Sequence, residues 1–137
     1  MRIREIAWAK LNLTLEVLGR RDDGFHELRS LVAFAGVGDS LEFVPGDSDV
    51  PPVVSELARA SSGPDGFKLD VEGPFAKALS GANLIVHAAQ AAKDRFPELG
   101  FGKFHLVKTL PVAAGLGGGS ADAAAALRLL VQANNGA

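Results

Sequence analysis

The stretch from Leu110 to Leu130, LPVAAGLGGGSADAAAALRLL, places a glycine-rich run directly before an alanine-rich run. An ordered glycine costs roughly 0.5–1 kcal/mol more than an alanine, because its backbone loses more freedom. Alanine has the highest helix propensity, so residues 121–130 are predicted to form a helix with Ser120 as its N-cap. Ordering four glycines beside a helix start is costly, which indicates that this loop has a specific task.

The task predicted for this loop is anion binding. A helix start carries unpaired N–H groups and the positive end of the macrodipole, and glycines let further N–H groups approach a ligand closely. We therefore interpret residues 115–120 as a phosphate-binding loop. The alternative is a flexible tether before a core helix, although tethers usually also carry serine, proline or charge.

The familiar nucleotide-binding motifs do not fit the loop. A Walker-type loop requires Gly-Lys-Ser/Thr, and no lysine follows Lys108. A dinucleotide fingerprint that starts at Gly115 requires a glycine where Ser120 stands. The loop is therefore a phosphate loop of another kind.

Composition narrows the classes of partner. The 137 residues amount to one domain with a real core, and the net charge of −2 argues against nucleic-acid and anionic-membrane partners. The chain has no cysteine, and His26, His87 and His105 are scattered, so we expect no metal site and a reducing, cytoplasmic setting. The N-terminal MRIREIAWAK has charges inside its apolar stretch, and no segment is long enough to span a bilayer. We expect no membrane partner.

Patterns of alternation and capping predict an α+β fold in one domain, residues 1–137. Strands are predicted at 2–9, 10–19, 30–36, 40–46, 67–73 and 102–110, with turns at 20–24 and 36–39. The strand at 10–19 is expected to be half-buried, and residues 45–66 to be a loop. Asn83 is predicted to cap a helix over 84–96, with Leu84, Ala88, Ala91 and Ala92 as its inner stripe.

Three segments in order carry a family resemblance: AKLNLTLEVLGRRDDGFHEL at 9–28, NLIVHAA at 83–89 and PVAAGLGGGSADAAA at 111–125. Together they resemble the GHMP kinases, whose phosphate loop reads roughly Pro-x-x-x-Gly-Leu-Gly-Gly/Ser-Ser-Ala. AKLNL followed by GRRxDGxHEL is similar to the branch that phosphorylates a hydroxyl of a cytidine-diphosphate-linked methylerythritol in non-mevalonate isoprenoid synthesis. The resemblance implies a GHMP-kinase N-terminal domain: a mixed sheet, helices on one face, and a left-handed β-α-β unit around the 83–95 helix.

The resemblance also implies roles for single residues. The loop residues that would hold the phosphates of ATP, with its Mg²⁺, are Pro111, Gly115, Leu116, Gly117, Gly118, Gly119 and Ser120. Lys10 and Asn12 would lie beside the substrate hydroxyl and the transferred phosphate. They share strand parity, although on the residues alone a solvated strand face is the commoner explanation.

The remaining implied roles concern the two bases. Phe25 would stack on the cytosine ring and His26 would contact the base edge. The family usually has tyrosine where Phe25 stands, so a hydroxyl is missing here. Asn83 would lie near the adenosine.

Several alternatives stay open. Another GHMP small-molecule kinase would share the loop but would have no use for a cytosine clamp, and a non-catalytic nucleotide-binding fragment would keep the loop without the chemistry. Asp122 is predicted to stabilise the helix start, with a catalytic or metal-binding role as the alternative.

The length of the chain carries a further expectation. The family's members are longer and place a catalytic aspartate beyond the loop helix, so we expect the C-terminal GHMP domain to be absent from this chain. Without it, we expect the chain to be inactive and its exposed apolar surface to drive self-association.

Overall fold

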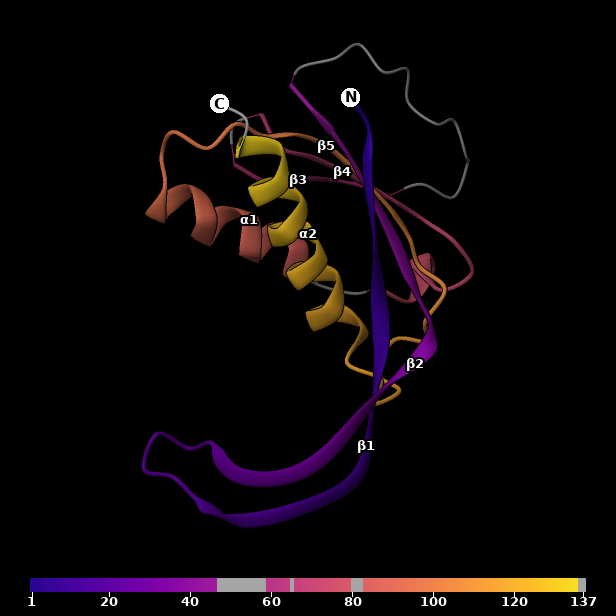
Figure 1. Cartoon of the computed structure of the whole chain (residues 1–137), viewed down its shortest axis with the longest axis vertical. Coiled ribbons are helices and arrows are strands. Elements are labelled where there is room, and N and C mark those ends of the chain that lie inside the picture. The colour runs from indigo at the N-terminus through magenta and orange to yellow at the C-terminus, as the bar shows by residue number, and fades with distance from the viewer. Residues whose placement is uncertain (47–58, 65, 80–82, 136–137) are drawn as a thin grey trace.

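The computed structural model describes residues 1–46, 59–64, 66–79 and 83–135. They form a five-stranded sheet in the order β1-β2-β5-β4-β3, with two helices on one face (Figure 1). The elements are β1 (Ile3–Arg20), β2 (His26–Pro45), β3 (Arg59–Ser62), β4 (Lys68–Glu72), the 3₁₀-helix η1 (Ala76–Ala78), α1 (Leu84–Arg95), β5 (Gly102–Val107) and α2 (Gly118–Asn134). Strands β4 and β5 are parallel and the other pairs antiparallel, so the predicted α+β class with a mixed sheet is confirmed.

The core lies between the sheet and the two helices. Alternate residues of the strands supply its sheet side, namely Leu41, Phe43, Leu69, Val71, Phe104 and Leu106, all buried. The rings of Phe43 and Phe104 stack with their centroids 4.3 Å apart. From α2, the small side chains of Ala125 and Ala126 are also buried. Burying each large side chain contributes about 1.5–3 kcal/mol, and this packing fixes α2 on the sheet.

The two long strands differ from the prediction. β1 runs without a break from Ile3 to Arg20 and so joins the two strands predicted at 2–9 and 10–19, and β2 runs through the segment 36–39 that was predicted to be a turn. A Cβ on Gly38 would lie 2.5 Å from the backbone oxygen of Ala7. Gly38 therefore marks a close approach of two strands, which only glycine allows, and not a chain reversal.

The predicted loop at 45–66 is partly wrong. Its residues 59–62 form β3, which pairs antiparallel with β4 and extends the sheet by one strand. Residues 47–58 and 65 of this prediction lie outside the described part of the chain.

Helix α1 begins where Asn83 predicted it. The Asn83 side chain accepts a hydrogen bond from the Ile85 N–H at 2.9 Å, which confirms the cap. The predicted inner stripe is wrong, because the buried residues are Ile85 and Ala89 while Leu84 is 47% exposed. Leu84 instead approaches the glycine loop, where a Cβ on Gly119 would lie 3.3 Å from its Cδ1.

In the described part of the chain no helix is long and apolar enough to cross a membrane.

The connection through α1 joins two adjacent strands that run in the same direction. β4 leads through η1 and α1 to its parallel neighbour β5. This is the β-α-β unit that the family resemblance implied. Its left-handed sense stays a prediction.

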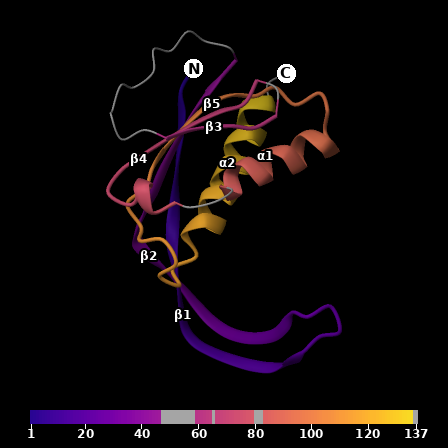
Figure 2. The same ribbon diagram turned by 180° about the vertical axis from the view of Figure 1, so that it is seen from behind.

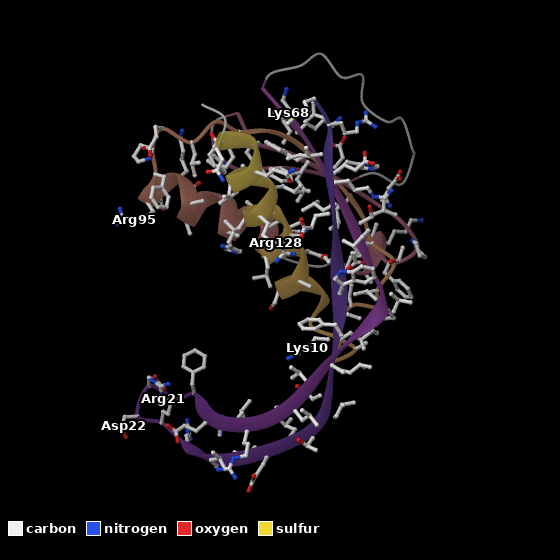
Figure 3. All side chains as sticks on the ribbon, viewed as in Figure 1. Lys10, Arg21, Asp22, Lys68, Arg95 and Arg128 are labelled. Carbon is white, nitrogen blue, oxygen red and sulfur yellow. The ribbon has the colours of Figure 1, made fainter. Side chains whose placement is uncertain are left out.

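β1 and β2 leave the body of the sheet as a curved hairpin (Figure 2), which begins near Lys10 (Figure 3). The strand predicted to be half-buried at 10–19 is instead exposed on both faces, and Leu13, Leu15 and Val17 are 58–60% exposed. The alternation is real, but no other described element covers its apolar face. The hairpin turn is closed by a hydrogen bond from the Arg21 N–H to the Phe25 oxygen, at 2.7 Å.

Candidate functional site

The glycine-rich loop between β5 and α2 lines a pocket of about 240 Å³. Its lining residues are Leu79, Leu84, Lys108, Pro111, Val112, Ala113, Ala114, Gly115, Leu116, Gly117, Gly118, Gly119 and Ser120. All seven loop residues that the sequence singled out are therefore brought together around one hollow. That hollow lies at the first turn of α2.

The start of α2 differs from the prediction by three residues. Gly117, and not Ser120, is the N-cap, and it adopts the left-handed conformation with φ of +66°. Glycine takes this conformation at little cost, so the helix begins at Gly118 and Ser120 falls in its first turn. No side chain caps the first-turn N–H groups. These free donors, at the positive end of the helix dipole, fit a phosphate group.

Lys10 connects β1 to the loop. Its backbone N–H donates to the Leu116 oxygen at 2.8 Å, and a Cβ on Gly117 would lie 3.5 Å from both Cβ and Cε of Lys10. Figure 3 shows the Lys10 side chain on the side of the sheet where α2 begins. The structure thus places this lysine beside the loop, although the sequence separates them by more than a hundred residues.

Asn12 follows Lys10 on the same face of β1. The two pair regularly with Phe34 and Val32 of β2, without a register shift between them. The Asn12 Oδ1 accepts a hydrogen bond from the Ser30 Oγ at 2.9 Å. This bond holds the amide at the base of the hairpin, one strand repeat beyond Lys10.

Phe25 and His26 lie at the far end of the hairpin, next to the turn that Arg21 and Asp22 mark in Figure 3. The Phe25 side chain is 72% exposed, and its backbone N–H donates to Asp23 Oδ1 at 3.0 Å. His26 begins β2. Neither residue lines the pocket at the loop.

Asn83 also lies outside the lining of that pocket. Its side-chain oxygen caps α1, so it adjoins the pocket only through the neighbouring Leu84. The structure therefore confirms that Asn83 caps α1, as the sequence predicted. The role near the adenosine that the resemblance implied stays a prediction.

A buried charge cluster beneath the loop was not predicted from the sequence. It consists of Asp39 in β2, Lys108 after β5 and Asp122 in α2, and the three side chains are 0–4% exposed. The Lys108 Nζ donates to Asp39 Oδ2 and, at 2.8 Å, to Asp122 Oδ2. The prediction that Asp122 stabilises the helix start is wrong, because the helix begins at Gly118 and the first turn holds no acidic residue.

The cluster also holds the loop backbone. Asp39 Oδ1 accepts hydrogen bonds from the N–H groups of Thr109 and Leu110, at 2.6 and 2.7 Å. A Cβ on Gly118 would lie 3.0 Å from the Lys108 Nζ, so the loop rests directly on this ammonium group. These contacts fix the chain where it enters the loop.

The electrostatics of the cluster are uneven. Burial alone would lower the pKa of Lys108, but its hydrogen bonds to Asp122 and Asp39, together with the charges of these carboxylates, outweigh burial and raise the pKa above its ordinary value. Burial raises the pKa of Asp122 to about 7, against the lowering effect of Lys108. The Oδ1 atom of Asp122 is buried without a hydrogen-bond partner. Two carboxylates thus share one ammonium group, and Asp122 is the poorly satisfied member.

A signal for this cluster was present in the sequence. In GKFHLVKTL, Lys108 stands two residues after Leu106 and four after Phe104, which is a position on the buried face. Asp122 precedes the buried Ala125 and Ala126 by three and four residues, which is the buried stripe of α2. A charged residue at an apolar position of the pattern indicates a buried ion pair.

Metal binding and a second hollow complete the site. No three His, Cys, Asp or Glu side chains gather as metal ligands within the described ranges.

A more apolar hollow adjoins the loop between β1 and β2, and Trp8, 46% exposed, lines it together with Pro111 and Leu116. The same loop residues therefore contribute to both hollows.

Comparisons with known proteins agree with this geometry. Residues 83–137 match the family described as "GHMP kinases N terminal domain". A Rhodopseudomonas palustris protein named 4-diphosphocytidyl-2-C-methyl-D-erythritol kinase is 48% identical, over 98% of this chain and 40% of that protein. A Methylobacterium radiotolerans protein of the same name is 52% identical, over 92% of this chain and 38% of that protein.

A solved structure gives the same correspondence. The crystal structure of a 4-(cytidine 5'-diphospho)-2C-methyl-D-erythritol kinase is 33% identical, with a TM-score of 0.65 over 96% of this chain and 40% of that chain. The 137 residues thus span about 40% of the length of the relatives that they match.

Proposed function

We propose that this chain belongs to the GHMP kinases, whose N-terminal domain residues 83–137 match, and that the protein phosphorylates a hydroxyl of 4-diphosphocytidyl-2-C-methyl-D-erythritol with ATP. The observation that carries the proposal is the pocket formed by residues 111–120 at an uncapped helix start, with Lys10 beside it. The names of the relatives support the choice of substrate.

The loop and Lys10 perform the phosphate part of the reaction. The N–H groups of Gly117–Ser120 hold the phosphates, and Pro111, Gly115 and Leu116 shape the pocket around them. When bound, ATP would supply the phosphoryl group, and Mg²⁺ would neutralise charge on its phosphates. The Lys10 ammonium stabilises negative charge on the transferred group, and the Asn12 amide orients the acceptor hydroxyl.

The hairpin and α1 hold the two bases. The exposed ring of Phe25 stacks on the cytosine, and His26 contacts the base edge. The side-chain oxygen of Asn83 already caps α1. Asn83 therefore contributes to adenosine binding by fixing the start of that helix. Both ligands are small molecules, and we place the reaction in the cytoplasm, with which a chain without cysteine agrees.

The test combines a loop variant with a matched control. Gly117→Val should abolish Mg-ATP binding and phosphorylation of the cytidylylated methylerythritol, because valine is strained at φ of +66° and its side chain would stand in the loop. Gly36→Val is the control, since a Cβ there meets nothing within 4 Å and β-branched residues suit strands. Calorimetry and a phosphorylation assay give the readouts. Undiminished affinity in Gly117→Val would return the loop to the role of a tether.

Two alternatives have their own outcomes in the same assay. Phosphorylation of mevalonate or homoserine, and not of the cytidylylated substrate, would make the protein another GHMP kinase. We further propose that residues 1–137 on their own bind nucleotide without turnover, because a C-terminal GHMP domain supplies the missing catalytic carboxylate. Turnover at about 1–100 per second by these 137 residues alone would contradict this.

A further inference from the structure

The buried cluster of Asp39, Lys108 and Asp122 joins the two ends of the phosphate loop. At the loop's beginning, Asp39 holds the N–H groups of Thr109 and Leu110. At its end, Asp122 lies in α2, one turn after the first loop-facing N–H groups. Lys108 bridges the two carboxylates and also lines the loop pocket. A change of charge in this cluster therefore changes the electrostatic potential at the phosphates that the loop binds.

The number of charges in the cluster is unbalanced. Two carboxylates and one ammonium group leave a net charge of −1 in a buried space, which is unfavourable without further partners. The groups that face Asp122 are Asp39 from β2 and Lys108 from the end of β5, and Asp122 Oδ1 has no partner at all. A proton on that oxygen removes the excess charge. Burial already raises the pKa of Asp122 to about 7, so the proton is available near neutral pH.

We propose that Asp122 is a positioning residue which takes up a proton from solvent when a phosphorylated nucleotide binds the loop. The inference rests on the proposed function, because the nucleotide supplies the new negative charge. Buffer acid gives its proton to the carboxylate, which becomes a carboxylic acid, and the buffer is left as its conjugate base. Lys108 then faces a single carboxylate, Asp39, and its remaining charge is directed to the phosphates.

The chemistry explains why both carboxylates are needed. Asp39 is bound to the loop backbone as well as to Lys108, so it is the fixed partner of the ammonium group. Asp122 is the carboxylate that can give up its ion pair with the Lys108 ammonium group, since one of its oxygens has no hydrogen-bond partner. Lys108 lines the loop pocket, and a negative Asp122 bonded to its ammonium group would repel an anion bound there.

The direct test is carboxyl titration by ¹³C NMR of the protein with and without saturating Mg-ADP. We expect the midpoint of Asp122 to lie near neutrality in the free protein and to rise by about one pH unit with the nucleotide bound. Asp94, an exposed carboxyl that binds Gln90 on α1, serves as the internal reference and should not move. A midpoint for Asp122 that Mg-ADP leaves unchanged would overturn the inference.

A second test counts the protons. Calorimetric titrations with Mg-ADP at pH 7.5, in two buffers of different ionisation enthalpy, should show an uptake of about half a proton more in the wild-type protein than in Asp122→Asn. Asp94→Asn should behave as the wild type. In the kinase assay, Asp122→Asn should flatten the pH dependence of KM for ATP more than that of kcat. Equal proton uptake in all three proteins would again overturn the inference.

The outcomes separate this inference from the proposed function. Mg-ADP that binds the loop without proton uptake overturns the role of Asp122 and leaves the kinase assignment standing. Failure of Mg-ADP to bind the wild-type protein at all overturns both. If Asp122→Asn does not fold, the NMR titration of the wild-type protein alone gives the decision.

Discussion

Ala113 is held in the left-handed conformation, with φ of 59°, the one described residue other than glycine with a positive φ. For a residue with a Cβ this conformation costs about 1–2 kcal/mol, whereas glycine adopts it freely. A glycine in place of alanine, however, lowers stability by about 0.4–1 kcal/mol, because it makes the unfolded chain more flexible. Ala113→Gly should therefore raise the free energy of unfolding by about 0.5–1 kcal/mol, measured by urea denaturation. Ala114→Gly, where φ is not positive, should lower it. A loss of equal size in both variants would show that Ala113 is unstrained.

Asp122 should make stability depend on pH. Its folded pKa of about 7 lies above the ordinary 3.8, so the folded state binds the proton more tightly than the unfolded chain. The stabilisation is complete below about pH 4 and is lost as the pH rises through about 7. The free energy of unfolding of the wild type, minus that of Asp122→Asn, should fall over this range in urea titrations. A difference that stays constant from pH 4 to 8 would contradict the assignment, and Asp94→Asn checks for general charge effects.

Among the elements, the curved hairpin of β1 and β2 presents Phe25 at its turn, with a side chain that is 72% exposed. Phe25→Ala in the whole protein should weaken binding of the cytidine-bearing substrate by about 1–3 kcal/mol, the range for stacking of a base on an aromatic ring. ATP affinity should hardly change. Phe34→Ala, which removes a similarly exposed ring from strand β2 of the same hairpin, is the control. Calorimetry with both ligands decides, because equal losses would make Phe25 a structural residue.

The elements that sequence patterns predicted are those fixed by neighbouring residues. The Asn83 cap, the alternation of β5 and the glycine loop before α2 all depend on contacts within a few positions, and they were found. The break expected at Gly38 was wrong, because only the opposite strand reveals that this glycine makes room for the backbone of Ala7. The cluster under the loop was missed for the same reason, since Asp39 and Lys108 are 69 positions apart in the chain.

At the scale of the whole molecule, the hairpin leaves several large apolar side chains in water. Leu13, Leu15 and Phe34 are 59%, 58% and 70% exposed, and exposed apolar patches of this kind usually mark an interface. Residues 1–137 alone should therefore self-associate, so that sedimentation velocity shows a mean mass that rises with protein concentration. The double variant Leu13→Lys with Leu15→Lys should reduce this association. A monomer at every concentration would contradict the prediction.

The hollow next to the loop contains the chain's single tryptophan, and the chain has no tyrosine. All emission excited at 295 nm therefore arises from one indole, Trp8, whose neighbours in that hollow include Leu116 of the loop. Because Trp8 is about half exposed, its spectrum responds to small changes in contact with water. The fold thus carries its own optical reporter, so the binding of Mg-ADP at the loop can be followed by stopped-flow mixing on the unlabelled chain.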